Sequence, residues 1–176
     1  AIARRMASTG FFLAVGTGFV IALIGLIFLR PLALLLGSTP TILPYAETYL
    51  SFVLMAAPFM CGALCLNNQM RFQGNAAYSM FGILTGACIN VVLAPILIFV
   101  FDMGITGAGI STFTGESCSM LVLLWMSRMK RNIHISHRNF TPSVAMLKEI
   151  FAGGTPSLTR QGMASISVAL LNVAAG

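Results

Sequence analysis

Glu116 is an acid at a position where an acid is costly. It stands about halfway along a run of mainly apolar and small residues that begins near Gly104. A charge at the centre of a membrane costs at least ~2.5 kcal/mol, so such side chains usually face a bundle interior or a watery cavity. Thr112 and Ser119 would share one helix face with it. This pattern favours a cation or proton site, and a protonated Glu116 hydrogen-bonded to a neighbouring helix explains it equally well.

Asn90 is a second polar residue near the middle of an apolar run. A buried amide can hold two helices together, or it can coordinate a cation through its carbonyl oxygen. Taken alone, Asn90 favours the helix contact. Pro95 follows five residues later, removes a backbone donor and predicts a bend in the helix. Bent helices are tolerated in membranes where they line cavities.

Other chemistries find little support in the sequence. Ser117 follows the acid, but a serine nucleophile needs a nearby base, and neither His134 nor His137 lies in a predicted span. Cys61 and Cys65 share a helix face, yet a structural metal site usually needs four ligands, and no histidine or acid joins them. We therefore expect neither an enzyme nor a bound cofactor, and we interpret the cysteines as small buried thiols.

The composition places these residues in a membrane protein. Of the 176 residues, 57% are hydrophobic and only 8% are charged, with a mean hydropathy of +0.92. A soluble domain carries about 25% charged residues. In lipid every backbone polar group must be paired within the chain, which leaves helices or a closed barrel. The long apolar runs, without the alternation of barrel strands, predict an all-α bundle of transmembrane helices.

Five stretches are long enough to span a bilayer, which takes about 20 predominantly apolar residues. The predicted spans run near Phe11–Leu36, Pro44–Asn67, Ala76–Phe101 and Gly104–Met126, and a fifth begins near Thr155 and is cut at Gly176. Between the fourth and fifth spans, Pro142–Phe151 has apolar residues opposite polar ones, which predicts a short helix in the membrane interface. Gly153–Pro156 is expected to break it before the fifth span. Because the last residues still belong to an apolar run, we interpret the chain as a fragment of a longer protein.

The basic residues predict the orientation of the spans. Eight of the ten fall on one flank of the membrane when alternate loops are counted, and Arg30 falls on the other. Arg160, in the fifth span, can reach the same basic flank. The residues of this flank are Arg4, Arg5, Arg71, Arg128, Lys130, Arg131, Arg138 and Lys148. We expect it to face the cytoplasm, and the net charge of +6 then follows from orientation and does not indicate a nucleic-acid partner.

Five short segments occur in an order and spacing that cover nearly the whole chain. They are Tyr45–Pro58, Arg71–Gly74, Asn90–Pro95, Gly104–Gly109 and Gly153–Ser157. With these segments the chain resembles the multidrug and toxic compound extrusion (MATE) family of cation-coupled exporters, which have two lobes of six helices. The resemblance implies that residues 1–127 form four N-lobe spans, that residues 128–154 form a cytoplasmic interlobe linker, and that residues 155–176 begin the C-lobe.

The resemblance also implies an ion site. Members of the family are similar in combining an acid on the first helix with an Asn and an Asp one turn apart on the fifth, and a Thr on the sixth. Asn90 matches the Asn and Thr112 the Thr, whereas Ala94 stands where the Asp is expected. Our hypothesis is that Glu116 replaces part of the lost charge. Asn90, Thr112 and Glu116 are therefore the candidate site for the coupling ion, Na⁺ or H⁺.

The resemblance implies a secondary antiporter of the inner (cytoplasmic) membrane. We expect a multi-pass, monomeric protein that exports organic solutes, often cationic and amphiphilic, in exchange for Na⁺ or H⁺ by alternating access. The alternative is a lipid-linked oligosaccharide flippase of a related fold. Such a cavity would be expected to hold several Arg or Lys for a pyrophosphate, and only Arg160 approaches the membrane interior. A purely structural scaffold is disfavoured by the cost of Glu116.

Overall fold

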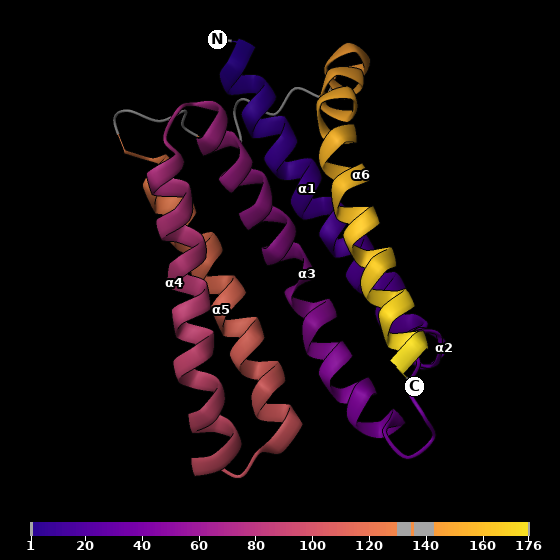
Figure 1. Ribbon diagram of the computed structural model, residues 1–176. Coiled ribbons are helices and arrows are strands. Elements are labelled where there is room, and N and C mark those ends of the chain that lie inside the picture. The colour runs from indigo at the N-terminus through magenta and orange to yellow at the C-terminus, as the bar shows by residue number, and fades with distance from the viewer. Residues whose placement is uncertain (1, 130–134, 136–142, 176) are drawn as a thin grey trace.

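The chain folds into a bundle of antiparallel helices without strands among the residues described. The computed structural model describes residues 2–129, 135 and 143–175. Figure 1 shows successive long helices running in alternating directions, so the chain crosses the bundle from one end to the other five times. The helices are α1 (Ile2–Ile27), α2 (Leu29–Leu35), α3 (Leu43–Phe72), α4 (Ala76–Pro95), a π-helical turn η1 (Ile96–Val100), α5 (Gly104–Ser127) and α6 (Val144–Ala175).

The first predicted span is two helices. The sequence predicts one helix over Phe11–Leu36, but α1 ends at Ile27 and the short α2 follows after Phe28, whose ψ of 31° is not helical. Pro31 accounts for the break, because it has no N–H to donate to the carbonyl of Ile27 and its ring crowds that carbonyl.

Pro95 changes the type of the helix that contains it, and whether it also bends the helix stays a prediction. The α-helical turns of α4 end at Pro95, and the next five residues form the wider π-helical turn η1. Because proline cannot donate to the carbonyl four residues back, the chain rearranges its hydrogen bonds there. The turn into α5 then uses positive φ angles at Asp102 (52°) and Gly104 (55°), a conformation that glycine adopts freely and that aspartate tolerates.

The predicted interruption before the fifth span is absent. The sequence predicts an interfacial helix, a break at Gly153–Pro156 and then a new span. The structure instead has one helix, α6, which runs without a break from Val144 to Ala175. A continuous helix keeps almost all backbone groups paired, and membrane helices accept a proline when hydroxyl side chains supply further bonds. The hydroxyl of Thr155 donates to the carbonyl of Phe151 at 2.8 Å, immediately before Pro156.

Fewer helices than expected meet a simple length-and-hydropathy criterion for a membrane span. Among the described residues three do: α1, α3, and α4 together with η1. The other two predicted spans, in α5 and α6, fall outside it. Glu116 and the many hydroxyl residues of α5 lower its hydropathy, although it has 24 residues and packs against both α3 and α4. Polar residues inside a bundle are compatible with a spanning helix when they face other helices.

Most of the basic residues whose positions are described lie at one end of the bundle, and Arg30 of α2 lies at the other. The start of α1, the α3–α4 connection, the end of α5 and the start of α6 all lie at the upper end in Figure 1. The opposite end carries α2 and the α4–η1–α5 turn. Five of the eight flank residues therefore share one end: Arg4, Arg5, Arg71, Arg128 and Lys148. Lys130, Arg131 and Arg138 lie outside the described residues, and the assignment of this end to the cytoplasm stays a prediction.

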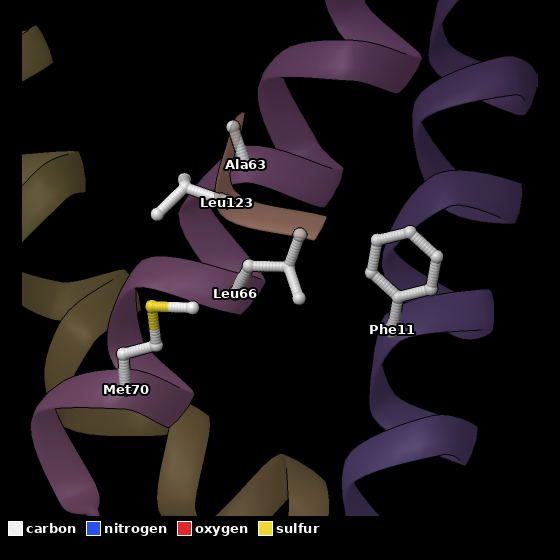
Figure 2. Close-up of a cluster of buried hydrophobic side chains, with 5 residues drawn as sticks. All are labelled: Phe11, Ala63, Leu66, Met70 and Leu123. Atoms are coloured by element: carbon white, nitrogen blue, oxygen red, sulfur yellow. The ribbon is translucent and has the colours of Figure 1, made fainter. Parts of the chain in front are cut away.

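The core is built around α3, which packs against α1 on one side and α5 on the other. Figure 2 shows its centre, where Leu66 of α3 points toward the ring of Phe11 on α1, with Leu123 of α5 close by. Ala63 and Met70 complete this cluster of buried side chains. Among the described elements α6 contacts α1 alone and only slightly, so α1, α3, α4 and α5 form the tightly packed part of the bundle.

Candidate functional site

The α4–α5 interface is made mainly of small residues, and its residues are spaced four apart on each helix. Gly82, Gly86 and Asn90 form one stripe on α4, which faces a buried stripe of Ser111, Gly115, Ser119 and Leu123 on α5. The two backbones touch at Gly86 and Gly115: a methyl group at Gly86 would lie 2.7 Å from the carbonyl oxygen of Gly115. Small residues at such positions allow membrane helices to approach closely.

Two hydroxyl groups hold this interface at different depths. Ser119 donates to the carbonyl oxygen of Gly82 at 3.0 Å. Ser111 lies 3.1 Å from the amide oxygen of Asn90 and 2.8 Å from the carbonyl oxygen of Ala108, and it is fully buried. Hydrogen bonds of this kind between membrane helices are worth about 0.6 kcal/mol on average and up to about 1.7. Asn90 is therefore tied to α5 by a fixed contact.

A cavity of about 260 Å³ opens beside this interface, where α3 joins the two helices. Its polar lining comes from Asn90 of α4 and from Glu116 and Ser119 of α5. The rest of its wall is apolar or glycine: Met60, Ala63, Leu64, Ile83, Gly86, Ala87 and Gly115. The structure thus places the carboxyl of Glu116 and the amide of Asn90 on one small cavity.

Thr112 has a different place from the other two candidates. Its hydroxyl donates to the carbonyl oxygen of Ala108 in its own helix at 3.0 Å, and Thr112 does not line the cavity. Of the three residues predicted to share a helix face, Glu116 and Ser119 do line it. Ala94, the position at which the resemblance led us to expect an acid, is not part of the lining either.

The oxygen atoms around the cavity suit a monovalent cation or a proton. Glu116 is partly buried and forms no ion pair with any basic residue that the structure describes. The amide oxygen of Asn90 has two lone pairs, of which one faces Ser111. One carboxylate and neutral oxygens in a mostly apolar pocket favour a singly charged ion, because an unpaired negative charge is costly at low dielectric.

Comparison with known proteins decides the family. The family model described as MatE matches residues 2–96, which is more than half of the chain. The chain belongs to the MatE family. This confirms the resemblance to MATE transporters, and with it the all-α bundle of a multi-pass membrane protein. Members of this family are transporters and not enzymes.

Individual MatE relatives extend the similarity almost to the whole chain. The multidrug export protein MepA of Staphylococcus aureus (strain bovine RF122 / ET3-1) is 26% identical over 160 residues, 90% of this chain and 36% of MepA. A MATE transporter structure in the outward-facing conformation superposes with a TM-score of 0.83 and 26% identity over 96% of this chain and 40% of that one. An inward-facing MATE structure superposes with a TM-score of 0.77 and 26% identity, over 86% and 35%. The chain thus spans about a third of the length of its curated relatives.

Reasoning from the sequence of this MatE chain missed Ser111 and the contribution of α3. Ser111 carries the bond to Asn90, whereas the resemblance pointed to its neighbour Thr112. A signal was present, because Ser111, Gly115 and Ser119 repeat every four residues, as small interface residues do. Met60 and Leu64, the apolar wall from α3, have no such signal, because nothing in their types separates a cavity wall from ordinary packing.

Proposed function

We propose that this chain is part of the N-lobe of a secondary active antiporter that exports organic solutes in exchange for Na⁺ or H⁺. The single observation that carries the proposal is the partly buried Glu116, which shares a cavity with Asn90 inside a bundle of MATE type. An acid that costs several kcal/mol in a bilayer needs a function or a partner, and an exchanged cation supplies both.

The mechanism follows from what ion loading changes. When the cavity is empty of ions, Glu116 is a negative charge beside glycines and apolar side chains. This uncompensated charge favours arrangements of the helices that admit water to the cavity. When Na⁺ or H⁺ neutralises it, the helices around the cavity can close without that cost. The ion shifts the balance between outward and inward states only to the extent that it binds one state more tightly. The turn η1, next to Pro95 on α4, is a place where such a change can bend the helix.

The exported solute belongs to the same proposal. MepA bears the name of a multidrug export protein, and we infer an organic, often cationic and amphiphilic, solute for this chain too. A lipid-linked pyrophosphate is a poorer fit, because no Arg or Lys of the described part of the chain lines the Glu116 cavity. We further propose that residues 1–127 and 155–176 belong to different lobes, joined by residues 128–154, and that the protein acts as a monomer in the bacterial cytoplasmic membrane.

The test replaces Glu116 with Gln in the full-length protein, which keeps the size of the side chain and removes its charge. Right-side-out vesicles that contain the protein are loaded with ethidium, and efflux is followed under an imposed inward Na⁺ gradient, an imposed inward H⁺ gradient, or neither. We expect Glu116→Gln to insert normally and to lose the response to both gradients. Asp102→Asn is the matched control, since Asp102 is exposed in the α4–α5 turn and asparagine tolerates its positive φ. Gradient-driven efflux by Glu116→Gln at the wild-type rate would end the proposal.

A further inference from the structure

A larger cavity, of about 500 Å³, lies at the basic end of the bundle between α1, α3 and α6. It shares no lining residue with the Glu116 cavity and extends further toward the end of α3, around Asn68, Gln69 and Phe72. Pockets for drug-sized ligands fall in the range of about 300–1,000 Å³. Its remaining lining residues are Ala3, Met6, Ala7, Gly10, Cys65, Gln73, Glu149, Ile150 and Gly154.

The charge of this cavity is opposite to that of its surroundings. Among the described residues that line it, Glu149 of α6 alone is charged. Arg4 and Arg5 adjoin Ala3 on α1 and are exposed, yet neither lines the cavity. The cavity is therefore a local negative site on an otherwise basic end, which disfavours a phosphate or carboxylate ligand and favours a cation.

The rest of the lining suits an amphiphilic cation better than a bare ion. Gln69 uses its amide N–H groups within the protein, donating to the carbonyl oxygen of Ala7 at 2.8 Å and to the sulfur of Cys65 at 3.3 Å. Its amide oxygen accepts no hydrogen bond from the described residues and can face a ligand. Met6, Phe72 and Ile150 add apolar and aromatic surface, and an aromatic face also attracts an organic cation.

We propose that this cavity is a second solute site, at which an organic cation with an apolar body binds before it reaches the centre of the transporter. The inference rests on the proposed function, since the ligand is the exported solute. The site is distinct from the Glu116 cavity: it draws on α1, α3 and α6, whereas the Glu116 cavity draws on α3, α4 and α5. The part of the chain that we assign to the N-lobe and the end of the linker that we assign to residues 128–154 both contribute to it.

Gly10 offers a way to fill this cavity without disturbing the helices. A methyl group added there would meet the amide nitrogen of Gln69 at 3.7 Å and the sulfur of Cys65 at 4.0 Å, both ordinary contacts, and Gly10 lines the cavity, so we expect a leucine at this position to extend into it. Gly16 is the matched control, because it lies on the same helix and its added methyl group would meet nothing within 4 Å.

The experiment measures ethidium binding by fluorescence to the purified full-length protein in a neutral detergent, without lipid and without an ion gradient. We expect Gly10→Leu to weaken binding by about tenfold or more, while Gly16→Leu leaves it unchanged. We expect Glu149→Gln to weaken it by up to about fivefold, the effect of an exposed charge pair. Ion coupling is read separately, from the gradient-driven efflux of Glu116→Gln, so failure of the second site and failure of the proposed function are distinguished.

A second arm locates the ligand directly and does not depend on the folding of a variant. Ethidium monoazide is photolysed on the wild-type protein, and the modified peptides are identified by mass spectrometry. Labelling within residues 3–10, 65–73 or 149–154 supports the proposal. Labelling confined to other peptides, or equal affinity in Gly10→Leu and Gly16→Leu, overturns it. Loss of the label on addition of phosphatidylethanolamine, whose headgroup is also an ammonium, would assign the cavity to lipid and overturn the solute assignment.

Discussion

The contact between Gly86 and Gly115 gives a prediction whose size follows from the structure. In Gly86→Ala the new methyl carbon would lie 2.7 Å from the carbonyl oxygen of Gly115 and 2.7 Å from the β-carbon of Ser119. Ordinary contact begins near 3.4 Å, so α4 and α5 must separate by roughly 0.7 Å. Both groups are fixed, one on the backbone and one at the base of a side chain, and neither can rotate away.

The cost of this separation exceeds what alanine gains as a helix former. Overpacking a close-packed interface typically costs about 1–3 kcal/mol, whereas Gly→Ala inside a helix favours folding by about 1 kcal/mol or less. We therefore expect Gly86→Ala to lower the free energy of unfolding by up to about 2 kcal/mol. The separation would also stretch the 3.1 Å contact between Ser111 and Asn90, one turn further along. We expect the rate of ion-coupled efflux by Gly86→Ala to fall together with its free energy of unfolding.

Reversible unfolding of the purified full-length protein in SDS measures this free energy, and Gly16→Ala is the control. It introduces the same methyl group on a helix where the group meets nothing within 4 Å, so we expect it to be neutral or slightly stabilising. Equal unfolding free energies for Gly86→Ala and Gly16→Ala would refute the reasoning, because the two helices would then not be in contact at this point.

Three further predictions concern the ion site and the bent helix. Ser111→Ala should cost about 0.6–1.7 kcal/mol in SDS unfolding, and Ser117→Ala, whose hydroxyl bonds only its own helix, should cost less; the reverse order would contradict the Asn90 contact. Thr112→Val should reduce Na⁺- or pH-driven ethidium efflux less than Glu116→Gln does, because Thr112 does not line the cavity; an equal loss would move the site toward Thr112. Pro95→Ala should slow efflux without reducing the amount of inserted protein, because it allows the α-helical hydrogen bonds to continue through η1, and unchanged efflux would show that the bend has no part in transport.

Much of the fold could be predicted because lipid leaves few choices. Apolar length identified the helices, and Gly37, Gly74 and Gly104, which adopt positive φ, all lie at the turns between them. The break at Pro31 was also readable, since an interior proline rarely leaves a helix straight. The continuity of α6 could not be predicted from the sequence, because the same glycines and proline that end a helix in water are tolerated where the backbone has no other partner.

Two residues of the candidate site, Glu116 and Asn90, could be predicted from the sequence, but the side chains that contact them could not. Glu116 and Asn90 stand out because polar groups in an apolar run need a reason. Which hydroxyl faces Asn90 depends on the rotation of α5 about its own axis, and Ser111 and Thr112 differ by about 100° in that rotation. The packing of Gly86 on Gly115 sets the rotation, and it is a property of two helices together.

The most direct test of the account counts the ion that leaves when solute binds. Purified full-length protein is equilibrated with Na⁺ or at a fixed pH in a weakly buffered solution, ethidium is added, and the released Na⁺ or H⁺ is measured. We expect release from the wild-type protein and none from Glu116→Gln. Release of the same amount from both proteins would contradict the claim that Glu116 holds the exchanged ion.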